Sequence, residues 1–226
     1  MLEFDWQSLI DARQILAAGA WITLKVTLVA IGCGMAWGTV LAVCAVSRIK
    51  LLNTFSHAYV SLFRSIPLVM LLLWFFLIVP QVLKAVFDLS PTVDIRLVSA
   101  MVAFSMLEGA FFAEIIRAGI LGLSRGQFHA ARSLGMTPYQ TMRYIILPQA
   151  FKAMLPILLT QCIVIFQDTS LVYVIALGDF FRNAVSIGER DGTLVQMLLF
   201  AGLVYWAICS TLSAAVKMVQ QRTQHD

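Results

Sequence analysis

Two carboxylates lie inside long apolar stretches of the sequence, Glu108 and Asp168. A charge at the centre of a membrane helix costs about 2.5–3.5 kcal/mol, so each group must face protein, water or a ligand. Gly109 and Ala110 follow Glu108, and such small residues permit close approach of a second helix or a ligand. The polar residues beside Asp168 are Gln167, Thr169 and Ser170. These groups could bind the ammonium group of a solute along a translocation pathway, although a buried hydrogen-bond network at a subunit interface explains them equally well.

The sequence offers no set of residues for catalysis or metal binding. Its three histidines are scattered, and no nucleophile–base set accompanies them: His57, His129 and His225. The cysteines lack the paired short spacing of a zinc site or a disulfide framework: Cys33, Cys44, Cys162 and Cys209. No G-x-x-x-x-G-K-[ST] phosphate loop occurs in the chain. We therefore expect no catalytic residue, no metal and no cofactor bound by this chain.

The composition excludes an ordinary soluble domain. The chain has 226 residues, of which 60% are hydrophobic and 12% charged, and its mean hydropathy is +0.87. Soluble domains carry roughly 25% charged residues, so this chain has too few charges to cover a soluble surface. It begins Met1-Leu2-Glu3-Phe4-Asp5, which is acidic where a signal peptide is basic, and we expect no cleaved signal. The sequence predicts an integral membrane protein.

Five segments are long and apolar enough to cross a membrane, which takes about 20 residues. They cover about residues 20–46, 59–80, 97–116, 151 to beyond 166, and 194–216. Between them lie polar connections, without an internal repeat or a flexible linker. The sequence thus predicts an all-α fold of about five transmembrane helices in a single domain, 1–226. The fourth apolar segment is longer than one span requires, so we expect a break or bend near Asp168–Thr169.

The basic residues outside the spans predict the orientation of the chain. One side would hold nine of them: Arg48, Lys50, Arg117, Arg125, Arg132, Arg143, Lys152, Lys217 and Arg222. The other side would hold five: Arg13, Lys84, Arg96, Arg182 and Arg190. The acids outside the spans fall on this second side, except Asp226. Because short cytoplasmic loops are enriched in Lys and Arg, the first side is predicted to be cytoplasmic, with the N-terminus outside and the C-terminus inside.

The longest connection, about 117–149, carries two helix start signals. Ser124 and Gln127 have the spacing of a capping box, and Gly135 could end the helix that follows in a left-handed conformation. Thr137 and Gln140 form a second possible box, and Pro148 would end or kink the second helix. We expect a helix, a glycine turn and a helix, which could lie on lipid headgroups or form a docking surface for a cytoplasmic protein.

This loop resembles the EAA loop of binding-protein-dependent ABC importer permeases. The matching residues are His129, Ala130, Ala131, Gly135, Ile145, Leu147 and Pro148. His129 stands where the family usually has glutamate. Three further elements resemble the polar amino acid branch of the family: Phe63-Arg64-Ser65-Ile66-Pro67, the stretch from Glu114 to Gly119 with Gly126-Gln127, and Gln167-Asp168-Thr169-Ser170-Leu171. Within that branch, the chain most resembles permeases of glutamate/aspartate importers.

The resemblance implies a function and a set of partners. The fold would be that of a type I ABC importer permease, and the loop would form a coupling helix that docks on a separate ATP-binding subunit. That subunit would use ATP and Mg²⁺, while a second, related permease chain and an external binding protein for a polar amino acid would complete the importer in the bacterial inner membrane. Lipid is the other expected partner, and nucleic acid is not expected. The alternative is an ATP-independent secondary transporter or channel, which explains the spans but not two capped helices in one loop.

Overall fold

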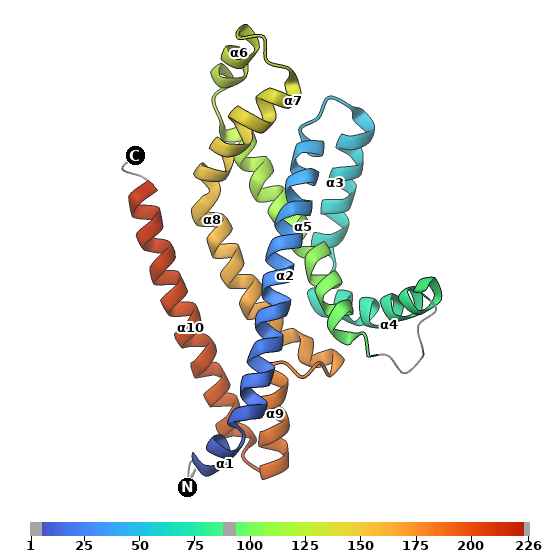
Figure 1. Cartoon of the computed structure of the whole chain (residues 1–226), viewed down its shortest axis with the longest axis vertical. Coiled ribbons are helices and arrows are strands. Elements are labelled where there is room, and N and C mark those ends of the chain that lie inside the picture. Colours follow the sequence, from blue (N-terminus) through green and yellow to red (C-terminus); the bar gives the residue numbers. More distant parts are fainter. Residues whose placement is uncertain (1–5, 88–93, 224–226) are drawn as a thin grey trace.

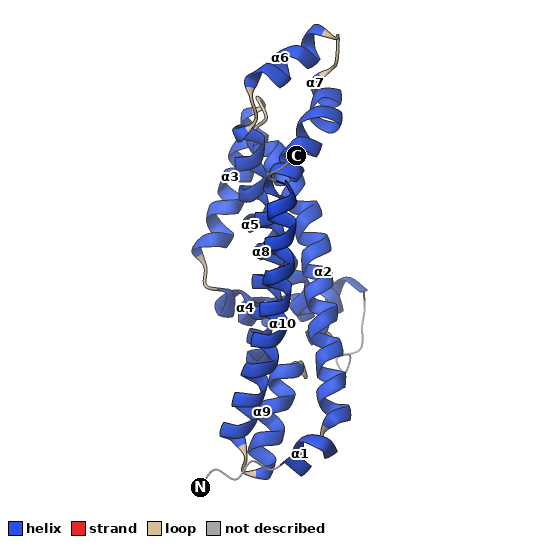
Figure 2. Ribbon diagram, turned by 90° about the vertical axis from the view of Figure 1, so that its left-hand side faces the viewer, coloured by secondary structure: helices blue, strands red, loops and turns tan. Residues whose placement is uncertain are grey.

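The computed structural model describes residues 6–87 and 94–223, and these residues are almost entirely helical, with no β-strand among them (Figure 1, Figure 2). The α-helices are α1 (Trp6–Asp11), α2 (Arg13–Ala45), α3 (Lys50–Ser65), α4 (Leu68–Phe87), α5 (Arg96–Gly122), α6 (Arg125–Ser133), α7 (Pro138–Gln140), α8 (Leu147–Asp168), α9 (Phe180–Asp191) and α10 (Leu194–Thr223). A π-helical segment, η1 (Thr141–Ile146), joins α7 to α8, and a 3₁₀ segment, η2 (Thr169–Ile175), follows α8. The all-α fold class predicted from the sequence is confirmed.

The described residues contain five helical stretches long and apolar enough to span a membrane, as predicted. They are Arg13–Ala45, Leu68–Val86, Arg96–Gly122, Pro138–Ile175 and Leu194–Gln221. Much of their surface is exposed, and only the Arg96–Gly122 helix is buried over most of its apolar length. A helix that exposes apolar side chains on most of its surface needs lipid or another subunit around it.

The prediction of one continuous second span over residues 59–80 is wrong. Helix α3 ends at Ser65, Ile66 is extended with φ −103° and ψ 129°, and α4 begins at Leu68 after Pro67. A proline disfavours the helical conformation of the residue before it, so the chain breaks at this point although its hydropathy continues. The two pieces then diverge: α3 runs beside α5, whereas α4 lies across the long axis of the molecule (Figure 1).

Helices α2 and α5 form the central pair of the bundle, packed along each other (Figure 1). A stripe of small buried residues on α2 allows this contact: Ala30, Gly34, Gly38 and Ala42. A Cβ atom added at Gly38 would lie 2.7 Å from Cβ of Phe112 and 2.8 Å from the carbonyl oxygen of Gly109, both on α5. The backbones of the two helices therefore approach so closely that only glycine fits at Gly38 without a shift.

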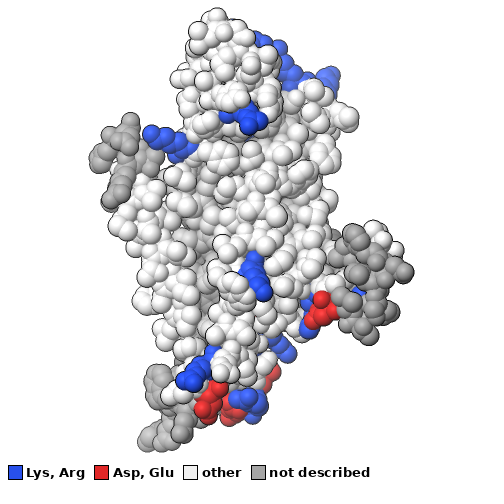
Figure 3. All heavy atoms as spheres, viewed as in Figure 1, with Lys and Arg blue, Asp and Glu red and all other residues white. Residues whose placement is uncertain are grey.

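The two ends of the molecule differ in charge. The α6–α7 hairpin, the α2–α3 connection and the end of α10 lie toward one end, and α1 and α9 lie at the other (Figure 1). On the face drawn in Figure 3, Lys and Arg stand at the hairpin end without acidic neighbours, whereas the acidic atoms all lie in the lower half. This division matches the one predicted from the sequence. The acidic start of the chain and Asp226 lie outside the described residues.

Helix α9 is fixed to α2 at the end opposite the hairpin. The backbone N–H of Phe180 donates to Oγ1 of Thr23, 3.1 Å away. Asp179 caps α9, and its carboxylate accepts from the backbone N–H groups of Phe181 and Arg182, each at 3.1 Å. Asp179 is fully buried, and burial raises the pKa of its carboxyl group to about 6.

Candidate functional site

Glu108 lies in the middle of α5 and is 1% exposed. Its Oε2 atom accepts a hydrogen bond of 2.9 Å from Nε2 of Gln161 on α8. The pair ties the central helix α5 to the helix that carries Asp168, and it gives the buried carboxyl group one of its partners. Gln161 was not among the residues predicted from the sequence, although an amide in the middle of the fourth apolar segment was a signal for it.

The residues around Asp168 do not form one cluster. Asp168 is half-buried at the end of α8, the helix whose Gln161 donates to Glu108. Thr169 is fully buried and donates to the carbonyl oxygen of Phe166 at 2.6 Å. Gln167 is exposed and lines a separate groove of about 580 Å³ against α10. Of the predicted pathway residues, Glu108 and Asp168 are thus connected through α8, while Gln167 lies in the groove against α10.

The predicted break of the fourth span is confirmed. Helix α8 ends at Asp168, the 3₁₀ segment η2 continues to Ile175, and Ala176 ends it in a left-handed conformation with φ 53°. Left-handed backbone is disfavoured for residues other than glycine, so it persists only where surrounding contacts hold it. Irregular backbone at membrane depth is tolerated where it is buried or lines a cavity.

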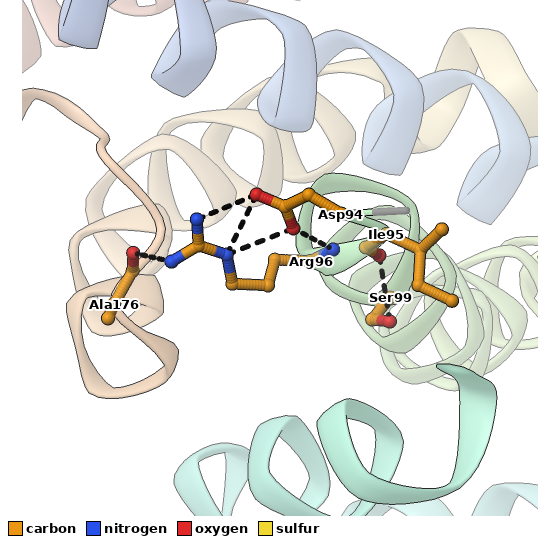
Figure 4. Close-up of polar contacts among 5 residues, drawn as sticks. All are labelled: Asp94, Ile95, Arg96, Ser99 and Ala176. Carbon is orange, nitrogen blue, oxygen red and sulfur yellow. Dashed lines mark hydrogen bonds and ion pairs between the residues drawn. The ribbon is translucent and has the colours of Figure 1, made fainter. Parts of the chain in front are cut away.

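Arg96 supplies such a contact. Its Nη1 atom donates to the carbonyl oxygen of Ala176 at 2.7 Å, and its Nε and Nη2 atoms donate to the Asp94 carboxylate at 3.0 and 2.6 Å (Figure 4). The guanidinium group lowers the pKa of Asp94 to about 2. In the next turn, Ser99 Oγ donates to the carbonyl oxygen of Ile95 at 3.0 Å. The start of α5 is thereby joined to the end of η2.

The predicted helix–turn–helix in the long loop is confirmed, with one change at its start. Ser124 caps α6, but its hydroxyl accepts from the N–H of Gly126. Gln127 does not complete a capping box and instead accepts from Gln149 Nε2 at 3.3 Å. Gly135 has φ +76°, the left-handed conformation expected of a helix-ending glycine.

The second start signal is confirmed in full, whereas the prediction that Pro148 ends the second helix is wrong. Gln140 N–H donates to Oγ1 of Thr137 at 3.2 Å, and Thr137 N–H donates to Oε1 of Gln140 at 2.8 Å. Pro148 does not end the helix, because α8 continues from Leu147 to Asp168. The regular helix does change just before it, since the π-helical segment η1 ends at Ile146.

The residues that resemble the EAA loop divide into two groups. Four of them are exposed, three on the hairpin and one at the start of α8: His129, Ala130, Gly135 and Pro148. The others are buried or packed against the core: Ala131, Ile145 and Leu147. The structure thus leaves the first group open to solvent and packs the second group inward.

These observations define a polytopic membrane transport subunit with a helical hairpin at one end and a broken helix beside a buried carboxyl group. Residues 34–225 match the family described as the inner membrane component of binding-protein-dependent transport systems, and the chain belongs to that family. It is therefore a permease subunit and a multi-pass inner membrane protein.

Two relatives and one solved structure show how far the similarity extends. The chain is 59% identical over 223 residues to the glutamate/aspartate import permease protein GltK of Escherichia coli O6:H1, covering 99% of this chain and 100% of that protein. It is 32% identical over 221 residues to the arginine transport system permease protein ArtQ of Bacillus subtilis, covering 98% of each. A crystal structure of an amino acid ABC transporter with histidines has a chain of the same fold, with a TM-score of 0.80, 29% identity and coverage of 98% of this chain and 99% of that one.

Proposed function

We propose that this chain is the permease subunit of an ATP-driven importer of acidic amino acids, glutamate and aspartate. The observation that carries the proposal is the 59% identity to GltK, which extends over 99% of the chain. Membership of a family of binding-protein-dependent systems favours this function over an ATP-independent transporter or channel. The helical hairpin agrees with it, because a solute channel does not require two capped helices in one loop between spans.

The translocation pathway in this proposal runs beside Glu108 and the break in the fourth span. Glu108 is buried next to Gln161. A second carboxylate, that of Asp168, is half-buried at the end of α8. A carboxylate at this depth would meet the ammonium group of the amino acid, while amide and backbone donors would meet its carboxylates. Thr169 and Ser170, also predicted for this pathway, start the 3₁₀ segment that would have to move when the pathway opens.

The hairpin is the proposed contact with a separate ATP-binding subunit. The exposed coupling residues cluster on α6 and the Gly135 turn, and the inward residues anchor them to η1 and α8. ATP and Mg²⁺ would be bound by the partner, so this chain itself would hold no cofactor and would not act as an enzyme. Closure of the ATP-binding subunits would push on the hairpin and, through α8, on the broken helix.

The remaining partners follow from the exposed apolar surface and the charged ends. Leu203 and Trp206 on α10 are 63% and 68% exposed, which leaves room for a second, related permease chain and for lipid. The hairpin end would be cytoplasmic, with the N-terminus outside, since the described part of that end carries unbalanced basic residues. An external amino acid-binding protein would then meet the end formed by α1 and α9.

The pathway is tested by uptake into proteoliposomes that contain the complete importer. Glu108→Gln and Asp168→Asn are expected to slow ATP-dependent glutamate uptake about tenfold or more, since each removes one charge-assisted contact of about 1.5–3 kcal/mol. Glu189→Gln is the control, because Glu189 is exposed on α9. Unchanged uptake by both pathway variants would remove these residues from the pathway, and uptake without ATP would favour the secondary transporter.

The coupling role is tested at the glycine turn. Gly135→Asp forces an acidic side chain into a left-handed position, so we expect assembled complexes that hydrolyse ATP without importing glutamate. Gly122→Asp introduces the same side chain where no atom lies within 4 Å and the backbone is not left-handed. Equal uptake by the two variants would mean that the hairpin only rests on lipid.

A further inference from the structure

A pocket of about 1090 Å³ opens between the end of α2 and the α6–α7 hairpin. Part of its wall is apolar and comes from the end of α2 and from the segment that contains α6, η1 and the start of α8: Val46, Phe128, Met142 and Leu147. Its volume lies slightly above the range for small-molecule sites, which is about 300–1,000 Å³. The pocket is therefore large enough for part of a chain-like apolar ligand.

Four arginines line the same pocket: Arg48, Arg125, Arg132 and Arg143. No Asp or Glu is among the described residues that line it. None of the four arginines forms an ion pair within the described part of the chain. Arg143 Nη1 donates to the hydroxyl of Tyr139 at 2.9 Å, which leaves its other N–H groups for a ligand. Guanidinium groups match the geometry of phosphate, so the pocket is suited to an anionic phosphate group.

The position of the pocket adds a membrane constraint. Helix α2 ends at Ala45, so the pocket residues Val46 and Arg48 lie directly at the end of a membrane span. On the other side of this connection, Leu51 at the start of α3 is 79% exposed, as expected of a side chain in contact with lipid. The apolar wall and the arginines thus adjoin the end of a helix that is apolar enough to span the membrane, and acyl chains give way to charged headgroups near such an end.

We propose that this pocket binds an anionic phospholipid, with its phosphate at the arginines and an acyl chain against the apolar wall. The lipid would belong to the leaflet on the hairpin side and would bridge the end of α2 to the hairpin. The ATP-binding partner is the less suitable occupant, because the apolar wall lies at the end of a membrane span. The predicted coupling residues His129 and Leu147 line the pocket. The opposite side of α6 remains for that partner, since Gln127, Ala130 and Leu134 are exposed and do not line the pocket.

The test measures binding of a fluorescent phosphatidylglycerol to the detergent-purified importer, with phosphatidylcholine of the same chains in parallel. The variant is Arg48→Gln/Arg143→Gln, whose two exposed side chains lie outside α6 and outside the predicted coupling residues. We expect it to bind phosphatidylglycerol about thirtyfold more weakly, since each arginine near an anionic lipid strengthens binding about fivefold. Phosphatidylcholine binding should not change. Arg48→Lys/Arg143→Lys keeps the charge and should keep most of the preference.

Lys152→Gln is the matched control. Lys152 is an exposed cation near the start of α8, close in sequence to Arg143, but it does not line the pocket. An equal loss in this control, or equal binding of the two lipids by the unmodified importer, would show only a general basic surface and overturn the proposal. Displacement of the lipid by inorganic phosphate alone would identify a small-anion site and also overturn it. Unchanged lipid binding with loss of the ATP-binding subunit from the arginine variant would assign the pocket to that subunit. The binding assay needs no transport, so its outcome is independent of the proposed substrate.

Discussion

Replacement of Gly38 by alanine tests whether α2 and α5 are as closely packed as the structure shows. The added Cβ atom would lie 2.7 Å from Cβ of Phe112, 2.8 Å from the Gly109 carbonyl oxygen and 2.9 Å from the backbone nitrogen of Ala113. Two of these atoms belong to backbone and the third is a Cβ, so no side-chain rotation relieves the contact. Overpacking of this kind costs about 1–3 kcal/mol, against which alanine gains up to about 1 kcal/mol in helix propensity.

Gly32→Ala on the same helix provides the comparison. Gly32 is exposed, and an added Cβ atom there meets nothing within 4 Å. This variant should gain the propensity without the clash, which places the two variants about 2 kcal/mol apart. For a chain of this size the difference corresponds to about 4–8 °C in Tm. Thermal melts of the purified complex, followed by size exclusion, measure it. Equal melting temperatures for the two alanine variants would refute the close contact between α2 and α5.

Three further changes test the caps and contacts outside the spans. Thr137→Ala removes one half of the capping box and should cost about 1 kcal/mol, seen as about fivefold faster amide exchange at Gln140. Burial raises the pKa of Asp179 to about 6 from an ordinary 3.8, so the folded state binds this proton more tightly and stability should rise by up to about 3 kcal/mol as the pH falls from 7 to 4. Arg96→Gln removes the contact to Ala176 and should cost about 1 kcal/mol and speed exchange at Ala176.

Each of these has its own control. Thr137→Ser keeps a hydroxyl cap and should exchange like the unmodified protein; equally fast exchange in both would mean that the cap is not formed. Asp179→Asn keeps a side-chain oxygen that can accept from the first N–H groups of α9, but it cannot titrate. If unfolding of this variant depends on pH as strongly as that of the unmodified protein, the dependence comes from other groups. Arg190→Gln removes a surface ion pair with Asp191 and should have no measurable effect. A loss as large as that of Arg96→Gln would show that the Ala176 contact adds nothing.

The features predicted correctly from the sequence are those that local residue types determine. Apolar length gave the number of spans, and the excess length of the fourth span gave its break at Asp168. The cap at Thr137 and the left-handed Gly135 follow from short-range hydrogen bonding and backbone sterics, which a few neighbouring residues fix. These interactions act over one helical turn, so they could be found without knowledge of the tertiary structure.

The features that were missed depend on parts of the chain that are distant in sequence, or on a signal that was given too little weight. Gln161 meets Glu108 across 53 positions, and no local pattern indicates that pairing. The groove that places Gln167 against α10 is likewise a tertiary feature. The break at Pro67 did have a local signal, but the hydropathy continues through it. The G-x-x-x-G spacing of Gly34 and Gly38 was also present in the sequence and was not used.

The π-helical segment η1 sets the direction in which the hairpin points. Leu147 N–H donates to the carbonyl oxygen of Met142, five residues earlier, so this turn contains one residue more than an α-helical turn. The wider turn takes up this residue, so α6 and α7 keep about the angle to α8 that an α-helix one residue shorter would give them. Each residue of an α-helix advances about 100° around its axis, so the same residues in regular α-helical form would turn the exposed face of α6 through about a quarter of a circle. The direction in which the hairpin faces therefore depends on this one π-helical turn.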